Sequence, residues 1–323
     1  MEPTPGGAAV AVLADAGALA RAAATVIVDE ARRAVEERGR FTLALSGGST
    51  PKPVYRLLAG PPFAALMPWE ATEIFWGDER CVAVSDPRSN QRMARESLLD
   101  HVPIPAGQVH PMSCAGGGAP GEAAARRSAA DYEAVLRRAL ASTAGAGPEG
   151  SRATSPIRGR GARPEVPGAE TAALDLVLLG LGDNGHTASL FPGSPALDER
   201  RRWVVAALED PDTAALTSPP GAGADSGTAP GPGGGADSGT APGPGGGAVS
   251  GAVARLWRVT LTAPFINRAR LVLFLVSGSG KAAVTRQVLA GEGDPHELPA
   301  LLIRPEPGRL WWLLDHEAAG PSR

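Results

Sequence analysis

The alternation of apolar and polar residues along the chain predicts strands and helices that follow one another. Between Ala16 and Arg38, apolar side chains recur every three or four residues, the spacing of a helix that buries one face. Short apolar runs bounded by glycine or by charged residues predict strands instead. The expected strands are Arg40–Ser46, Glu73–Arg80, Leu174–Gly182, Trp203–Leu208, Arg255–Thr262, Arg270–Gly278 and Arg309–Asp315. Further helices are expected within Ser46–Ala59 and at Ser89–Leu99, Gly121–Ala141 and Lys281–Gly291.

This order of elements predicts an α/β fold with a largely parallel sheet and helices on both of its faces. In such sheets, ligands bind where the strands end at their carboxyl termini. Polar residues that directly follow an expected strand are therefore the first candidates for a functional site.

Two stretches interrupt the pattern, at residues 143–170 and 217–251. They hold much of the chain's excess of 42 glycines and 31 prolines, and the second repeats GADSGTAPGPGG in direct succession. Segments with so few large apolar side chains do not form a core. Without them about 260 residues remain, a usual size for one α/β domain, so we expect residues 1–323 to form a single domain with two low-complexity insertions.

Charge and composition narrow the classes of function. With 31 basic and 34 acidic residues the formal charge is −3, which argues against binding nucleic acid through bulk electrostatics. The N-terminus lacks a basic, apolar targeting pattern, and no stretch approaches the ~18 apolar residues of a membrane span. Cys81 and Cys114 fit no zinc spacing and would form a disulfide only by chance of geometry. We expect a soluble, cytoplasmic protein that binds neither nucleic acid nor membrane.

Two glycine-rich loops between a strand and a helix suit a phosphate group. In Ser46–Thr50, backbone N–H groups and the start of the next helix favour an anion, although an ordinary turn has a similar composition. In Gly278–Lys281 a lysine adds a positive charge. The second loop is not a Walker motif, because Ala282 stands where that motif needs a hydroxyl.

A charged cluster, Asp78-Glu79-Arg80, ends the expected strand at Glu73–Arg80, and Asn90 follows it. A guanidinium at a strand end binds phosphate through its fork, and the carboxylates orient a sugar. Taken alone, the cluster also fits a solvated run of charges.

The richest segment is Gly180–Ser189, which follows an expected buried strand. Its glycines match the dinucleotide pattern GxGxxG, with Glu209 24 residues beyond Gly185. Pro192 and Pro195 disfavour that reading, because the fingerprint needs a full-length helix there.

His186 in this segment is the strongest candidate for a general base. Its ordinary pKa of about 6.5 suits proton transfer near neutral pH. The chain has neither a G-x-S-x-G nucleophile motif nor an H-E-x-x-H metal motif. Direct activation of water by His186 is therefore the expected chemistry.

Five blocks of the sequence resemble the 6-phosphogluconolactonases, in the order of that family. They are LALSGGSTP, WGDER followed by SNQRMARESLL, LGLGDNGHTASLFPG, RVTLTAPFINRAR and SGSGKAAV, between about Ala16 and Asp315. The resemblance implies a fold like those of glucosamine-6-phosphate deaminase and ribose-5-phosphate isomerase. It implies hydrolysis of 6-phospho-D-glucono-1,5-lactone to 6-phospho-D-gluconate in the oxidative pentose phosphate pathway, with neither a metal nor an organic cofactor.

By this resemblance His186 deprotonates water, and the phosphate lies against Ser46–Thr50, Arg80, Arg258 and Lys281. The assignment of Arg258 rests on the resemblance alone. The full set of expected substrate-binding residues is Ser46, Gly47, Gly48, Ser49, Thr50, Asp78, Glu79, Arg80, Asn90, Arg258 and Lys281.

One residue departs from the family pattern, which usually has Asp-Gly-His where this chain has Asn184-Gly185-His186. Asn184 is expected to orient the imidazole without the charge that would stabilise an imidazolium. Asp183, one residue earlier, is a candidate to supply that charge, so Asn184 and Asp183 join His186 as expected catalytic residues.

Two alternatives stay open at this point. An amino-sugar-phosphate isomerase or deaminase would share the glycine-histidine turn, but such enzymes usually continue with Asn-Glu-Pro, where this chain has Leu190-Phe191-Pro192. A non-catalytic sugar-phosphate sensor would use the same phosphate site, yet the N-terminus is too short and too acidic for a helix-turn-helix. A small sugar phosphate is the expected partner, and the oligomeric state stays open, with a monomer as one option.

Overall fold

The computed structural model describes residues 2–3, 7–114, 121–141, 172–209 and 255–320. Both expected insertions, at 143–170 and 217–251, lie outside these residues. The strands are β1 Glu2–Pro3, β2 Ala9–Leu13, β3 Phe41–Leu45, β4 Thr72–Trp76, β5 Asp78–Arg80, β6 Leu176–Leu179, β7 Val204–Glu209, β8 Leu256–Leu261, β9 Leu271–Val276 and β10 Arg309–Asp315. The α-helices are α1 Ala16–Arg38, α2 Pro51–Leu58, α3 Phe63–Leu66, α4 Asn90–Ser97, α5 Glu122–Ala141, α7 Ala263–Ile266, α8 Ala282–Ala290 and α9 His316–Ala319.

The first helix has the ends and the buried face that its sequence predicts. Asp15 caps it, because its Oδ1 accepts a hydrogen bond from the backbone N–H of Ala18 at 2.7 Å. Gly39 ends it with φ 74°, in the left-handed region that glycine tolerates. Ala23, Ile27 and their neighbours on the same face are fully buried against the core.

A parallel sheet forms the centre of the molecule. Its strand order is β1-β2-β10-β9-β6-β3-β4, and only β1 runs antiparallel to its neighbour. Every residue of β3, β6 and β9 is buried, and apart from Thr42 all of them are apolar, as is usual for strands covered on both faces. Phe274 of β9 stacks on Trp312 of β10, with ring centroids 3.8 Å apart. The expected parallel sheet is confirmed.

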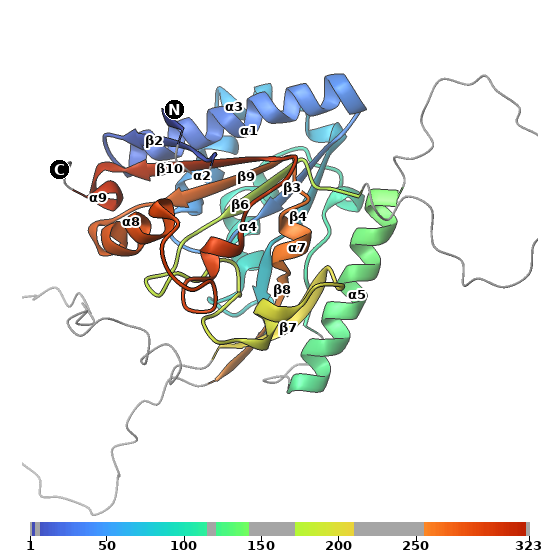
Figure 1. Cartoon of the computed structure of the whole chain (residues 1–323). Helices are drawn as coiled ribbons and strands as arrows, with labels where there is room; N and C mark the ends of the chain where they lie inside the picture. The colour runs from blue at the N-terminus through green and yellow to red at the C-terminus, as the bar shows by residue number, and fades with distance from the viewer. Residues whose placement is uncertain (1, 4–6, 115–120, 142–171, 210–254, 321–323) are drawn as a thin grey trace, which may run out of the picture.

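Helices cover both faces of this sheet, as the sequence predicts. Right-handed crossovers place α1 and α2 on one face, because the chain moves through them from β2 to β3 and from β3 to β4. The crossover from β9 to β10 moves in the opposite direction and places α8 on the other face. Figure 1 shows α1 and α8 on opposite sides of the sheet.

The segment predicted as one strand, Glu73–Arg80, is divided between two sheets. Gly77 lies at the division: its N–H donates to Leu45 O at 2.8 Å in the parallel sheet, and its carbonyl accepts from Leu261 N at 2.9 Å in the other. The second sheet is antiparallel, with the order β5-β8-β7. A single strand was the wrong prediction, because nothing in the local pattern shows that Gly77 bonds to two different neighbours.

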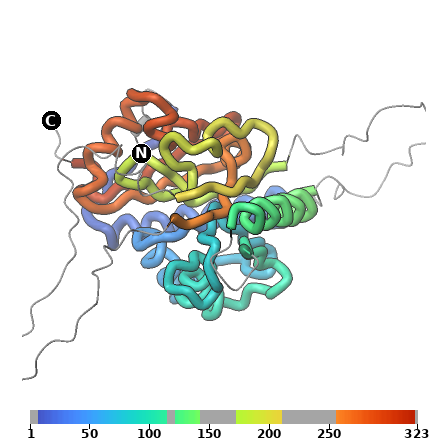
Figure 2. Tube along the Cα trace, turned by 90° about the horizontal axis from the view of Figure 1, so that it is seen from below, coloured from blue at the N-terminus to red at the C-terminus, as the bar shows by residue number. Residues whose placement is uncertain are grey.

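The small antiparallel sheet carries charged side chains on one face. Arg80 of β5 lies directly opposite Arg258 of β8, and Asp78 lies opposite Thr260 on the same face. Glu209 ends β7 one step further along this face. Helix α5 packs against β7 and β8 (Figure 1). Figure 2 shows residues 172–209 alongside the C-terminal segment 255–320, with the cyan segment that leads to residue 114 on the opposite side.

A disulfide joins Cys81 to Cys114, whose Cα atoms lie 4.9 Å apart. Cys81 directly follows β5 and is fully buried. We did not expect this bond from the sequence, because a separation of 33 residues says nothing about distance in the fold.

Candidate active site

The carboxyl ends of β3, β6 and β9 open onto a cavity of about 350 Å³. Its wall includes most of the residues expected from the sequence: Ser46, Gly47, Gly48, Ser49, Thr50, Asp78, Arg80, Asn90, His186, Arg258 and Lys281. Asp183 and Asn184 lie at a neighbouring cavity, and Glu79 lies at neither. The two sheets therefore bring together side chains from segments far apart in the sequence.

The loop Ser46–Thr50 is held close to its neighbours by Tyr55 of α2. The Tyr55 hydroxyl accepts from Ser46 N at 3.0 Å and donates to Ser46 O at 2.8 Å. A Cβ on Gly47 would lie 1.9 Å from Oδ1 of Asn90, so only glycine fits there. The Ser46 hydroxyl is buried and has no hydrogen-bond partner among the described residues.

Asp78 connects several groups on one side of the cavity. Its Oδ2 accepts a hydrogen bond from Ser189 Oγ at 2.6 Å, and its Oδ1 accepts from Asn90 Nδ2 at 3.2 Å. The oxygen of the Asn90 amide in turn accepts from Arg80 Nη1. The Arg80 Nε group is buried without a hydrogen-bond partner in the described part of the chain. This network fixes Arg80 through neutral groups, and none of the carboxylates in the described ranges forms an ion pair with it.

Glu79 points away from the cavity and supports the start of α4. Its carboxylate accepts from Asn90 N at 2.8 Å, from Gln91 N at 2.7 Å and from Ser89 Oγ at 3.1 Å. Burial raises the pKa of this carboxyl, and the backbone donors oppose that shift. Glu79 therefore holds the backbone N–H of Asn90 and does not line the cavity.

Arg258 is buried between two carboxylates. Its Nε donates to Glu209 Oε2 at 3.0 Å, and its Nη2 also contacts that oxygen. Its Nη1 lies 3.7 Å from Asp78 Oδ2. The guanidinium carbon lies 5.3 Å from the ring centroid of Phe191, whose ring packs at 5.1 Å from that of His186.

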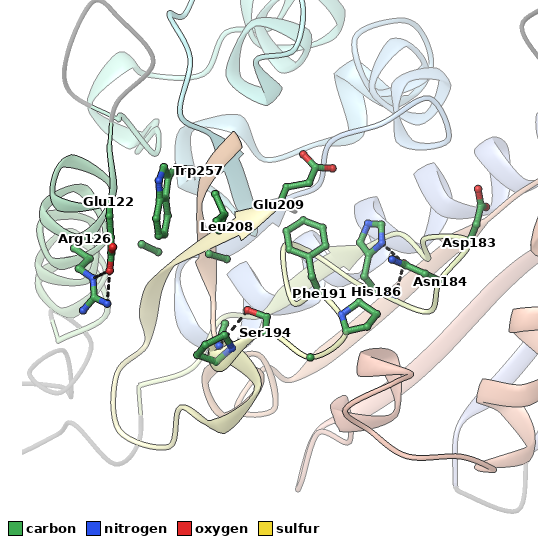
Figure 3. A pocket seen from close by; sticks show the side chains of 16 residues that line it. Glu122, Arg126, Asp183, Asn184, His186, Phe191, Ser194, Leu208, Glu209 and Trp257 are labelled. Carbon is green, nitrogen blue, oxygen red and sulfur yellow. Dashed lines mark hydrogen bonds and ion pairs between the residues drawn. The ribbon is translucent and has the colours of Figure 1, made fainter. Parts of the chain in front are cut away.

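Lys281 forms an ion pair with Asp183 at the rim of the cavity. The side chain of Asp183 is 76% exposed and points away from His186 and Asn184 (Figure 3). The structure therefore does not place Asp183 where it could supply the charge missing beside the histidine.

The imidazole of His186 is oriented by Asn184. Nδ1 lies 2.6 Å from Asn184 Oδ1, so Nδ1 carries the proton and Nε2 keeps its lone pair. Burial, together with a smaller effect of the nearby positive charge of Arg258, lowers the pKa of His186 to about 4. At neutral pH His186 is therefore an uncharged base.

Glycines shape the turn that presents His186. Gly185 has φ 76°, and a Cβ on Gly182 would lie 2.0 Å from the imidazole Nδ1. The segment continues as a short bridge between Thr187 and Leu190, and a one-turn 3₁₀ helix follows at Pro195–Asp198. The helix that the dinucleotide pattern requires is missing from this described segment, so that alternative is wrong.

A second cavity of about 540 Å³ lies on the other side of His186. Figure 3 shows Trp257 and Leu208 on its wall, Phe191 beside His186, and the Glu122–Arg126 ion pair at its far end. His186 and Glu209 border both cavities. The local sequence pattern does not mark Ser189 or Phe191 as site residues, and Glu209 stands out in it only through the dinucleotide pattern.

Among the described residues, no cluster of three or more His, Cys, Asp or Glu side chains could hold a metal ion. None of the helices in the described ranges has the length and apolar character of a bilayer crossing.

Comparisons with known proteins agree on one family. The family model described as glucosamine-6-phosphate isomerases/6-phosphogluconolactonase matches residues 14–219 and 248–312. A 6-phosphogluconolactonase of Synechocystis sp. is 36% identical over 309 residues, which are 96% of each chain. The structure of 6-phosphogluconolactonase from Trypanosoma cruzi superposes with a TM-score of 0.69 at 28% identity and covers 99% of this chain and 98% of that one.

A monomeric glucosamine-6-phosphate deaminase has the same fold, with a TM-score of 0.61 at 19% identity over 96% of this chain and 98% of that one. The expected resemblance to the deaminase fold is confirmed. The matched ranges include every residue of the 350 Å³ cavity, from Ser46 to Lys281. The chain belongs to the glucosamine-6-phosphate isomerase/6-phosphogluconolactonase family.

Proposed function

We propose that this chain hydrolyses 6-phospho-D-glucono-1,5-lactone to 6-phospho-D-gluconate, the lactonase step of the oxidative pentose phosphate pathway. One observation carries the proposal: an uncharged histidine, whose Nε2 has no hydrogen-bond partner among the described residues, borders a cavity that also holds two arginines and a lysine. A general base and a cationic site for a phosphate are the two features that this substrate requires.

His186 takes a proton from water through Nε2 as the water oxygen attacks the lactone carbonyl. Asn184 holds the ring in the required tautomer throughout, because its Oδ1 accepts the Nδ1 proton. The imidazolium then returns its proton to the ring oxygen as the bond between that oxygen and the carbonyl carbon breaks. The step consumes one water, and the carboxylic acid that it forms releases its proton to solvent to give the carboxylate.

The phosphate binds at the end of the cavity formed by Ser46–Thr50, Arg80 and Lys281. Ser46 Oγ and Arg80 Nε are buried donors without partners among the described residues, and phosphate oxygens would satisfy both. Helix α2 starts directly after this loop, at Pro51, and its dipole favours an anion there.

Arg258 lies between the phosphate end and the reacting carbon. It is the cross-strand neighbour of Arg80, and it packs on Phe191, the residue in contact with His186. A guanidinium in this place stabilises the negative charge that develops on the carbonyl oxygen. Asp78 and Asn90 act as positioning residues, because their hydrogen bonds hold Arg80 and Ser189.

Three further parts of the proposal concern the whole chain. Residues 1–323 form one domain, the enzyme acts in the cytoplasm on a small sugar phosphate, and it requires neither nucleic acid nor membrane. The disulfide at Cys81 makes the compartment testable, because thiols stay reduced in most cytosols. Mass spectrometry of protein alkylated at the moment of cell lysis should find both cysteines alkylated if the compartment is reducing.

The decisive experiment measures hydrolysis of freshly prepared lactone above its spontaneous rate, for the unaltered protein and for His186→Ala. Loss of the excess rate in the variant assigns the base. Binding of 6-phospho-D-gluconate without any excess rate in the folded, unaltered protein would overturn the proposal in favour of a sugar-phosphate sensor.

A further inference from the structure

Glu209 has no part in the mechanism above, yet it borders both cavities. It is the last residue of β7, and its side chain lies on the face of the small sheet that carries Arg80 and Arg258. Among the described residues, its carboxylate bonds only to the guanidinium of Arg258. A carboxylate beside a site for an anionic substrate is unfavourable for binding, so its presence needs a physical reason.

The pairing of the strands gives the first reason. Arg80 and Arg258 are directly opposite each other, and like charges in that position repel. Glu209 contacts the Nε and Nη2 side of Arg258, and Asp78 lies 3.7 Å from its Nη1. Arg258 is thus balanced by two carboxylates before any ligand binds, whereas Arg80 is held by neutral groups.

The charge of the product gives the second reason for a carboxylate at Glu209. Hydrolysis converts a lactone that is uncharged at its reacting end into a carboxylate, next to His186 and within the same cavity as Arg258. An unbalanced, buried guanidinium would bind that new carboxylate strongly, because charge-assisted hydrogen bonds are strongest away from water. It would gain much less from the uncharged lactone, so product would be retained more than substrate.

We propose that Glu209 neutralises Arg258 so that the carboxylate product leaves the site. Arg258 can then polarise the carbonyl oxygen during the reaction without holding the product afterwards. Glu209 is a positioning residue in this scheme, because it acts on the ligand through Arg258. The inference rests on the proposed lactonase function.

The test compares two ligands that differ only at the reacting end. 6-Phospho-D-gluconate carries the carboxylate, and D-glucitol 6-phosphate carries a neutral CH₂OH in its place. Dissociation constants of both are measured by calorimetry for the unaltered protein, Glu209→Gln and Glu209→Asp, and each is also measured as a competitive inhibitor of lactone hydrolysis. Glu96→Gln, which removes an exposed carboxylate of α4 paired with Arg92, is the matched control.

In Glu209→Gln, 6-phospho-D-gluconate should bind about tenfold more tightly, the effect of one partly screened charge. D-Glucitol 6-phosphate should change by less than about threefold, since it lacks the second anion. The value of kcat should fall as product release slows, and Glu209→Asp should restore both properties in part. Glu96→Gln should match the unaltered protein.

Weaker binding of both ligands in Glu209→Gln would overturn the inference, because a purely structural role of Glu209 predicts that result. Equal tightening of both ligands would also overturn it, since the effect would then not concern the carboxylate. Calorimetry distinguishes a failure of this inference from a failure of the proposed function. A protein that binds the ligands but hydrolyses no lactone rejects the lactonase activity. An active protein in which Glu209→Gln leaves the affinity difference between the two ligands unchanged rejects the role of Glu209.

Discussion

The two sheets of this protein differ in what they are made of and in what they do. The parallel sheet consists of apolar strands such as β9, all of whose residues are buried. The antiparallel sheet is short, and one of its faces carries Asp78, Arg80, Arg258 and Glu209. The first sheet provides stability through packing, and the second holds opposed charges at the site. Changes in one should therefore alter folding, and changes in the other should alter activity.

The largest effect is expected from the base that lies between the two sheets. His186→Ala should lower the enzyme-catalysed rate by about 10²–10⁴-fold, the usual contribution of a general base. The variant should unfold at nearly the same denaturant concentration, because the imidazole is replaced in a loop outside both sheets. Rates from a pH-stat assay and urea unfolding curves check both statements. A residual rate above a tenth of the original would assign the base elsewhere.

A change in the parallel sheet should give the opposite result. Phe274→Ala removes a fully buried ring that stacks on Trp312, so the free energy of unfolding should fall by about 3–5 kcal/mol. KM should stay within about twofold in the protein that remains folded. Leu66→Ala, at a side chain that is 44% exposed, is the control and should change stability by less than about 0.5 kcal/mol. A large rise in KM for Phe274→Ala would show that the parallel sheet also governs substrate binding, contrary to this division of roles.

Arg80 tests the charged face at its phosphate end. Arg80→Ala should raise KM for the phosphorylated lactone by about 10–100-fold, since a charge-assisted hydrogen bond contributes about 1.5–3 kcal/mol. D-Glucono-1,5-lactone, which lacks the phosphate, should be hydrolysed equally slowly by both proteins. Steady-state kinetics with the two lactones measures the difference. Equal losses on both lactones would place Arg80 at the reacting carbon instead.

The smallest effect is expected at Asn184, where the sequence departs from its family. Because the pKa of His186 is lowered to about 4, kcat/KM should hold its full value on the acid side until the pH approaches that value. Asn184→Asp places a negative charge beside Nδ1, which stabilises the imidazolium and raises this pKa. The acid limb should move to higher pH by about one unit, and turnover at pH 7 should rise a few-fold.

The pH profile also has a consequence for stability. The unfolded His186 titrates near pH 6.5 and the folded one near 4, so the unfolded chain binds more protons between these values. Stability from this residue is present above about pH 6.5 and is lost as the pH falls toward 4. In Asn184→Asp that loss should be smaller. An unmoved acid limb in the variant would mean that Asn184 does not contact the ring in solution.

Prediction from sequence succeeded where the information is local. The strand at Arg309–Asp315 is found with the expected ends, and α4 Asn90–Ser97 lies within the helix expected at Ser89–Leu99. Strand β2, which lies between the two-residue strand β1 and β10, was missed: it is only half-buried, with Val12 54% exposed, and its pattern is weak.

The candidate site was predictable in its parts but not in its connections. His186 and the glycine-rich loops stand out because each follows a buried strand. The contact between Arg258 and Glu209 joins residues 49 positions apart, and it depends on how β7 pairs with β8. The outward direction of Glu79 and the double role of Gly77 likewise depend on long-range pairing that no local pattern contains.

The Ser46 hydroxyl and Arg80 Nε, which lack partners in the described part of the chain, link the supply of substrate to the stability of the fold. Each buried donor without a partner costs about 1–3 kcal/mol, and under the proposed mode of binding a phosphate would recover this cost. A ligand at a hundred times its dissociation constant adds about 2.7 kcal/mol to stability. Melting temperature and resistance to proteases should therefore rise with the concentration of sugar phosphate, so that a cell with high flux through this step also keeps more of the enzyme intact.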